Sequence, residues 1–550
     1  MHGATRSDKP YGIWRANGKG TLKEGADAFK SALLKLKDPV FVVNKDDMPA
    51  VATGGTATLY DNVAAGDDAL PLSGFAPPLP PDSFGSTAFK CMLGIRYPYV
   101  AGAMANGITS VEMVVAAARA GMVGFFGAAG LPPSKVAEAI DRLQTELKDL
   151  PFGMNLIHSS GDPNLENEIV NLYLEKGVRL ISASAYMRLT PFIVLYRLKG
   201  IHSDADGNVV TPNRIVAKVS RVEVASRFFE PPPEKIVAKL LEQGLVTQEE
   251  ASLASRIPMA DALTAEADSG GHTDNRPALA LLPTMLALRD EICAQHQYSR
   301  SVPVGLGGGI ATPAATAAAF SMGAGYVITG SINQSCVEAG VCDTVRQMLV
   351  EAGQADVTMA PAADMFEMGG KVQVLKRGTM FAMRACKLYD CYVRYNDFAQ
   401  LPQKERDNIE KNFLRRSFGE EWEETRKFFL ARDPRQVERA EKDTRHKMAL
   451  VFRSYLGRSS MWGVVGDPDR KVDYQIWCGP AIGAFNEWVK GSFLEKAENR
   501  NFTTVALNLL VGASVVTRAS WLRNQGIQLP PDAASFVPMT ADALTDIIAS

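Results

Sequence analysis

The fold is decided by residues 302–331, which begin Val302-Pro303-Val304-Gly305-Leu306-Gly307-Gly308-Gly309-Ile310 and end Gly325-Tyr326-Val327-Ile328-Thr329-Gly330-Ser331. Each of these two runs is a short apolar strand that finishes in glycine. Between them, Thr312 and Pro313 are typical of the N-cap and the first position of a helix, which Gly323 would end. The stretch therefore predicts a strand–helix–strand unit with a glycine loop at the carboxyl end of both strands.

The same alternation extends back to about residue 95. A capping box at Thr109 and Glu112 predicts the start of a helix over 111–120, and further helices are expected from Pro133 and over 164–176. Short apolar strands that alternate with helices predict a parallel sheet. The number of units is close to the eight of a barrel, so we predict an α/β fold with a (β/α)8 TIM barrel over residues 91–340. The expected strands before residue 302 are 97–102, 123–126, 152–156, 180–184, 215–219 and the run that ends at Asp268.

The two flanks differ from this pattern. Residues 1–90 are expected to be an N-terminal cap region, with a helix over 26–37, a buried strand over 40–43 and a proline-rich linker or extended arm over 71–81. Residues 341–550 are expected to form a mostly helical accessory or lid domain. Its predicted helices are 405–418, 420–431, 436–455 and an apolar helix over 502–520 that docks on the body; residues 457–491 either line a substrate entrance or pack as a lid.

Composition excludes several classes of function. With 59 basic and 61 acidic residues the net charge is −2, which gives no support for a nucleic-acid or membrane partner. The seven cysteines form no C-x-x-C pair, and the six histidines lack the paired spacing of a zinc site, so no metal is predicted. Neither an apolar signal core at the N-terminus nor a membrane-length apolar run is evident. We expect a cytoplasmic protein.

The candidate chemistry lies in Asp268-Ser269-Gly270-Gly271-His272. An imidazole titrates near neutrality and can donate or accept a proton, although a histidine here could instead bond a loop carbonyl. Asp268 and Asp274 could orient it, and Asp268 could equally cap the loop. The glycines after residue 306 can bring backbone amides to a phosphate beside a helix N-terminus, or simply make tight turns. A dinucleotide fold is disfavoured because the third glycine and the acidic residue of its motif are absent.

Taken together, these motifs resemble one family. The sequence is similar to the trans-acting enoyl reductase subunits of polyunsaturated fatty acid synthases and related polyketide systems, within the nitronate monooxygenase-like FMN barrels. The barrel resemblance covers about 90–340 and the subfamily resemblance most of 90–500. The barrel motifs are residues 101–107, 153–155, 267–272, 307–310 and 328–331, and the subfamily motifs are residues 126–131, 195–200, 273–277 and 455–459.

The resemblance implies FMN and NADPH as cofactors. Ala103 and Met104 would offer backbone contacts to the flavin ring, and Asn155 would bind the ring or the ribityl chain. Lys218 would lie near the pyrimidine edge, unless it forms a surface salt bridge. Gly270 and Gly271 would lie against the ring or the ribityl tail. The phosphate would be held by Gly307, Gly308, Gly309, Gly330 and Ser331.

The resemblance also implies a reaction. NADPH would reduce FMN, and a hydride would pass to the β-carbon of a 2-enoyl thioester carried by acyl carrier protein. His272, at the family's active-site histidine position, would supply the proton or stabilise the enolate. A homodimer is expected. Two alternatives remain open: a flavin oxidase of the nitronate monooxygenase type, and a non-catalytic scaffold subunit that has lost its cofactor.

Overall fold

The computed structural model describes residues 11–18, 20–45, 48–59, 69–158 and 163–550. Its centre is a closed barrel of parallel strands that follow one another in chain order. The predicted TIM barrel is therefore confirmed. The strands are β7 (Tyr99–Ala101), β8 (Val123–Phe126), β9 (Gly153–Ile157), β10 (Leu180–Ser184), β13 (Arg214–Val219), β14 (Ala262–Glu266), β16 (Val304–Gly307) and β17 (Val327–Thr329).

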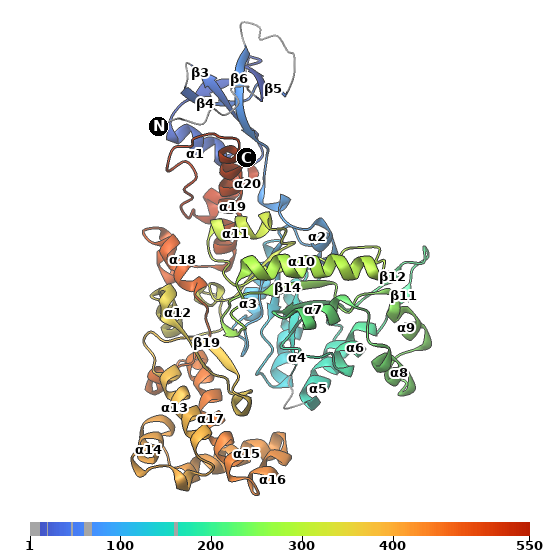
Figure 1. Ribbon diagram of the computed structural model, residues 1–550, viewed down its shortest axis with the longest axis vertical. Helices are drawn as coiled ribbons and strands as arrows, with labels where there is room; N and C mark the ends of the chain where they lie inside the picture. Colours follow the sequence, from blue (N-terminus) through green and yellow to red (C-terminus); the bar gives the residue numbers. More distant parts are fainter. Residues whose placement is uncertain (1–10, 19, 46–47, 60–68, 159–162) are drawn as a thin grey trace.

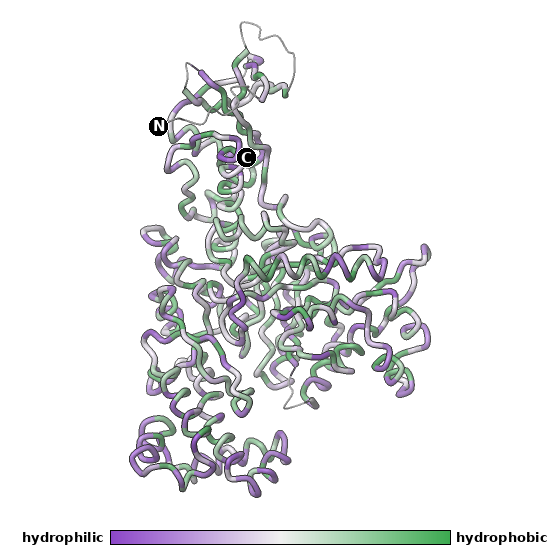
Figure 2. Tube along the Cα trace, viewed as in Figure 1, coloured by the Kyte–Doolittle hydropathy of each residue, from purple (hydrophilic) through white to green (hydrophobic). Residues whose placement is uncertain are grey.

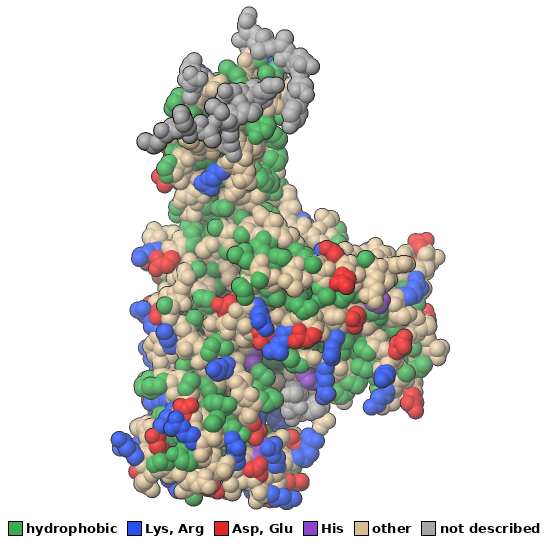
Figure 3. Space-filling model, in the orientation of Figure 1, with side chains coloured by type: hydrophobic (Ala, Val, Ile, Leu, Met, Phe, Trp, Pro, Cys, Tyr) green, Lys and Arg blue, Asp and Glu red, His purple; other side chains and the backbone are tan. Residues whose placement is uncertain are grey.

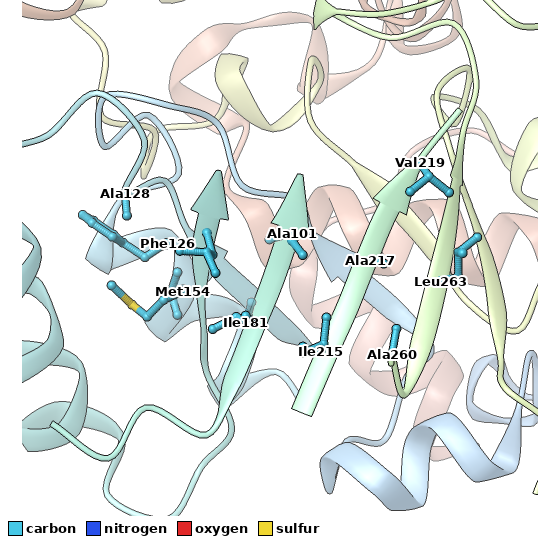
Figure 4. Packing of buried hydrophobic residues seen from close by; sticks show 14 of the residues in the cluster. Ala101, Phe126, Ala128, Met154, Ile181, Ile215, Ala217, Val219, Ala260 and Leu263 are labelled. Carbon is cyan, nitrogen blue, oxygen red and sulfur yellow. The ribbon is translucent and has the colours of Figure 1, made fainter. Parts of the chain in front are cut away.

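Successive side chains along each barrel strand face opposite ways, as the period of two requires. One set packs outward against the helices; Figure 4 shows part of it along neighbouring strands, including Ala101, Met154 and Ile181. The other set fills the barrel interior and includes Val100, Phe125, Leu180, Val216 and Tyr326. Helix α2 (Thr87–Leu93) closes the amino end of the barrel, where Phe89 stacks on Tyr326 with ring centroids 3.9 Å apart.

Helices follow the strands and form the outer layer of the barrel (Figure 1). They are α3 (Val111–Arg119), α4 (Pro133–Leu147), α5 (Pro163–Glu175), α6 (Pro191–Leu198), α7 (Val222–Phe229), α8 (Glu234–Glu242), α9 (Gln248–Leu253), α10 (Ala278–Gln295) and α11 (Pro313–Ser321). A hairpin of β11 (His202–Ser203) and β12 (Val209–Val210) projects before β13. Thr312 caps α11 through the amide of Ala315, as its sequence predicts.

The predicted capping box of α3 is wrong by one residue. Ser110 is the N-cap, and its hydroxyl accepts a hydrogen bond from the Met113 amide. Thr109 is instead fully buried, and its hydroxyl donates to the Gly102 carbonyl and accepts from the Met104 amide. The correction matters because Thr109 thereby fixes the loop between β7 and α3.

The N-terminal region is an antiparallel sheet of six strands with the order β2-β4-β3-β6-β1-β5. The expected linker over 71–81 is partly wrong, because Ala69–Ala76 forms β6 between β3 and β1. Four prolines of that stretch, Pro77, Pro78, Pro80 and Pro81, lie beyond the strand. The other elements are β1 (Gly12–Arg15), β2 (Thr21–Lys23), α1 (Ala26–Leu34), β3 (Val40–Lys45), β4 (Met48–Thr53) and β5 (Thr56–Leu59).

Helix α19 (Phe502–Asn524) joins this sheet to the barrel (Figure 1). Its first half packs on α11, and its second half packs against the N-terminal sheet and α1. The buried Arg518 donates to the carbonyls of Leu33 and Lys35 at the end of α1. By length and composition α19 could cross a membrane, with mean hydropathy 1.4, yet 78% of that window is buried inside the fold. It is packed as the core helix that its apolar sequence predicts.

The C-terminal region is mostly helical, and its outer helices are largely hydrophilic (Figure 2). Helices lie near the expected places, with two corrections. The single helix predicted over 436–455 is interrupted at 441–443 and forms two helices, and the second of these, α17, extends past residue 457 into the segment that we expected to be an entrance or lid. The helices are α12 (Asp343–Val350), α13 (Phe381–Arg394), α14 (Gln403–Asn408), a π-helical turn (Ile409–Leu414), α15 (Phe418–Arg432), α16 (Pro434–Ala440), α17 (Thr444–Val465), α18 (Ala481–Val489) and α20 (Ala541–Ala549).

A small antiparallel sheet links this region to the barrel. It contains β18 (Val357–Pro361), β19 (Lys371–Leu375) and β15 (Gly271–His272), in the order β15-β19-β18. His272 pairs with Val372, and Gly271 pairs with Gln373. The loop that follows barrel strand β14 therefore pairs, through β15, with strands that come after the barrel in the sequence.

Candidate functional site

The candidate site lies at the carboxyl ends of the barrel strands, where TIM barrels carry their reactive groups. We call this end the mouth; it comprises residues 101–107, 266–276, 307–310 and 330–331 together with the inward side chains just below them. Most residues predicted from the sequence lie here, because each follows or ends a barrel strand. The structure gives them different surroundings.

Two glycine loops leave open space at one side of the mouth. A Cβ on Gly309 would meet no atom within 4 Å, and one on Gly330 would lie 3.9 Å from Met104 Cγ. Within the described chain, no group accepts a hydrogen bond from the amides of Gly309, Ile310, Gly330 or Ser331. The N-terminus of α11 follows three residues later and adds its positive end. Unpaired amides beside open space fit a phosphate group.

The neighbouring glycines have a packing role. A Cβ on Gly307 would lie 2.5 Å from Ile328 Cγ2, and one on Gly308 would lie 2.7 Å from the backbone of Ala267 and Asp268. Gly308 also has a φ of +88°, a conformation that favours glycine. The sequence left two interpretations of these glycines open, tight turns and a phosphate site. Close packing requires Gly307 and Gly308, whereas Gly309 leaves open space.

The segment 477–479 covers part of the mouth. A Cβ on Gly270 would lie 2.6 Å from Cys478 Cα, so this glycine allows two backbones to touch. The Gly479 amide donates to Ser331 Oγ over 2.9 Å. Gly271, with φ +76°, has the Trp477 ring 3.9 Å from its Cβ position. Part of the predicted polar-aromatic segment thus contacts the mouth.

The loop after β7 is fixed from within the barrel. The Met104 amide donates to Thr109 Oγ1 over 3.0 Å, so it is already paired. A Cβ on Gly127 would lie 1.7 Å from the Met104 carbonyl oxygen, so only glycine allows the loop to approach this closely. Ala103 packs against the interior cluster. The predicted backbone contacts from this loop must therefore come from groups other than the Met104 amide.

Two polar pairs lie on the inward face just below the loops. Asn155 is 7% exposed, and its side-chain oxygen accepts from Ser184 Oγ over 2.9 Å. Lys218 Nζ lies 2.5 Å from Glu266 Oε1, with side-chain exposures of 27% and 14%. Lys218 thus forms a salt bridge, as the alternative interpretation held, but inside the mouth rather than on the outer surface. Glu266 also accepts from Ser269 Oγ.

His272 has a carboxylate partner from outside the barrel. Its Nε2 lies 2.9 Å from Asp364 Oδ1, in the loop between β18 and β19. The His272 side chain is 40% exposed, and its partial burial opposes protonation of the ring, but the hydrogen bond and charge of Asp364 outweigh this effect and raise the pKa of His272. The Lys218 charge acts against this shift and the Glu266 charge supports it. The imidazole is therefore kept in a form that can donate a proton at higher pH.

Neither aspartate that we expected to orient His272 contacts it in the structure. Asp274 forms a two-point ion pair with Arg221 at 2.9 and 3.0 Å and accepts from Ser220. Asp268 accepts from the side-chain amides of Asn275 and Gln373, which confirms its alternative role in holding the loop. The orienting carboxylate comes from residue 364.

Sequence reasoning missed Asp364, Glu266 and Gln373. Glu266 could have been found, because it ends β14 with the same inward parity as Thr264. Asp364 and Gln373 have no local signal, since β18 and β19 reach the mouth only through tertiary pairing with β15.

Comparison with known proteins shows the family to which the barrel belongs. The family model of nitronate monooxygenase matches residues 86–388, more than half of the chain. The chain belongs to the nitronate monooxygenase family. The resemblance inferred from the motifs is thereby confirmed. Residues 395–474 of this family member also match the inserted helical domain of [acyl-carrier-protein] S-malonyltransferase.

More similar proteins narrow the relationship. The enoyl reductase domain of MlnA from the macrolactin cluster of Bacillus amyloliquefaciens is 38% identical, with a TM-score of 0.76, and the match covers 81% of this chain and 99% of that one. One of the polyunsaturated fatty acid synthase subunits of Thraustochytrium sp. is 44% identical over 93% of this chain and 34% of the relative. Polyketide biosynthesis protein PksE of Bacillus subtilis is 44% identical over 79% and 56%. This family member thus spans about a third to a half of these two curated relatives.

Proposed function

We propose that this chain is a flavin-dependent enoyl reductase that acts on 2-enoyl thioesters carried by acyl carrier protein, with NADPH as the reductant. The observation that carries the proposal is the match to the MlnA enoyl reductase domain over 99% of its length. The curated relatives are subunits of polyunsaturated fatty acid synthases and polyketide pathway proteins, which supports a carrier-bound substrate.

The residues of the mouth fit FMN. Gly309, Ile310, Gly330 and Ser331 would hold the phosphate through unpaired amides. Asn155 and the loop at Ala103 line the adjoining interior, and Lys218 would place a cation near the ring. Bound FMN, reduced by NADPH, would supply the hydride that adds to the β-carbon of the enoyl group.

His272 would complete the reaction. Addition of hydride to the β-carbon leaves negative charge on the α-carbon and the thioester oxygen. His272, paired with Asp364, would deliver a proton to the α-carbon or hydrogen-bond the oxygen. The net change is that the double bond gains one hydride and one proton while NADPH is oxidised to NADP⁺.

An anaerobic visible spectrum tests the proposal. The purified chain, supplied with FMN, is mixed with NADPH and then with a crotonyl thioester. We expect a flavin band that bleaches with NADPH and returns with the thioester. A band that returns only after air is admitted would instead indicate the oxidase, and the absence of any band after FMN is supplied would indicate a scaffold.

A further inference from the structure

One face of α17 is turned toward the mouth and the loop that carries Asp364. His446, Arg453 and Ser460 are seven residues apart, about two helical turns, so they share this face. Each has a partner outside helices α12–α18. Ser460 Oγ accepts from the Asn106 side chain in the loop after β7, over 3.1 Å. The other two residues hold the turn between β18 and β19.

His446 holds the part of that turn nearer to β19. The histidine is 1% exposed, with Nδ1 3.0 Å from Glu367 Oε1 and Nε2 2.9 Å from Gln436 Oε1. The Gln436 amide nitrogen donates to Asp433, which leaves its oxygen facing the ring. Both ring nitrogens thus face an oxygen atom, which fixes the ring in place. Phe366, fully buried, anchors the same end.

Arg453 holds the part of the turn nearer to β18. Its Nε donates to the Ala363 carbonyl over 2.8 Å, and its Nη1 lies 3.9 Å from Glu367 Oε2. Asp364 follows Ala363 directly, and its side chain is 59% exposed. Packing therefore does little to fix the carboxylate, and the position of the backbone just before it decides where it lies.

We propose that Arg453 is a positioning residue, which holds the Ala363 carbonyl so that Asp364 meets His272. The effect of Arg453 on catalysis rests on the proposed function, whereas the contact between Asp364 and His272 does not. The segment that resembles a malonyltransferase insertion then acts on the chemistry of the barrel through α17. Among the described residues, the charges of Asp364, Lys218 and Glu266 act on the pKa of His272. Arg453 acts on Asp364 through the Ala363 carbonyl and also through its own charge, which lowers the pKa of Asp364.

The test compares two arginines of α17 in the full chain. Arg453→Met removes the bond to Ala363, whereas Arg458→Met breaks an ion pair with the buried Glu421 inside the helical region. Arg453→Lys keeps the charge and serves as the milder variant. The side chains of the six histidines are labelled with ¹³C and titrated by NMR, and His272→Gln assigns the His272 signal.

Arg453→Met should lower the apparent pKa of His272 by about half a unit to one unit, and Arg453→Lys should lower it less. Arg458→Met should leave that titration unchanged even if the melting temperature falls. An unchanged titration in Arg453→Met, or an equal shift in Arg458→Met, overturns the proposal. A shift seen only in the Arg453 variants supports positioning even if no enoyl thioester is reduced; that loss would count against the proposed function alone.

Discussion

The glycine-loop side of the mouth is one continuous piece of chain, whereas the side that carries His272 is assembled from distant pieces. Gly309, Ile310, Gly330 and Ser331 lie within one strand–helix–strand unit and offer backbone amides. His272, Asp364 and Arg453 come from the barrel, from a small sheet and from α17. Backbone amides cannot be removed by changing a side chain, so the first side can be broken by filling its space. The second can be dismantled one contact at a time.

The largest effect is expected from filling the glycine-loop side. Gly330 has no positive φ and has room for a Cβ, so Gly330→Val should fold but fill the space beside Met104. We expect purified protein without a flavin band, even after FMN is added. Gly419→Val, at a roomy position in α15 far from the mouth, is the control. Normal flavin content in Gly330→Val would mean that the phosphate lies elsewhere.

Removing His272, the proposed proton donor, should leave the glycine-loop side intact. His272→Ala should bind FMN and be reduced by NADPH, yet reduce enoyl thioesters about 10²- to 10⁴-fold more slowly. Stopped-flow absorbance separates the two half-reactions. His202→Ala, in the exposed β11–β12 hairpin, should behave like the unchanged chain. Full activity in His272→Ala would remove this residue from proton transfer.

These two sides also explain how far sequence reasoning reaches. The barrel and the glycine loops were predictable, because strand period, cap residues and glycines are local signals. The partner of His272 was not, since nothing near residue 272 shows that β19 will pair with it. Asp274, two residues away, was the natural expectation and is held by Arg221 instead. Proximity in sequence was a sound guide for the glycine-loop side of the mouth and a poor one for the side that carries His272.

The N-terminal sheet gives the same lesson. Prolines over 71–81 predict a linker, yet Pro71 lies within strand β6. Its register partner is Ile13 of β1, so the strand is stabilised by residues almost sixty positions earlier. The charge balance was a better guide than the prolines. The sequence has nearly equal numbers of acidic and basic residues, and their side chains are interspersed on the visible face of the barrel and the C-terminal helices (Figure 3).

A pH profile should sharpen the comparison on the side that carries His272. Asp364 raises the pKa of His272 above its ordinary 6.5, so the donor form persists to higher pH. Asp364→Asn should move the alkaline limb of enoyl reduction downward by about one pH unit. Asp274→Asn, which changes the carboxylate bound to Arg221, should leave the limb in place. An equal shift in both variants would contradict the assignment of Asp364.

The same pair makes a small contribution to stability with a defined sign. The raised pKa of His272 means that its share is fully present below pH 6.5 and is lost as pH rises through the raised value. The lowered pKa of Asp364 means that its share is present above 3.8 and is lost as pH falls through the lowered value. Because both side chains are substantially exposed, the total is at most about 1 kcal/mol. Asp364→Asn should therefore change the melting temperature little while it moves the pH profile.

The smallest effect is expected where a side chain assists the glycine-loop side. Ser331 Oγ accepts from the Gly479 amide, and its own proton remains able to reach a phosphate. Ser331→Ala should weaken FMN binding about fivefold, the loss of one modest hydrogen bond, as measured by fluorescence titration of the Kd. Ser335, four residues later, is fully buried and donates to the Ile332 carbonyl, so Ser335→Ala should lower the melting temperature and leave the Kd unchanged. A loss as large in Ser331→Ala as in Gly330→Val would mean that this side depends on side chains as well, and the contrast between the two sides of the mouth would no longer hold.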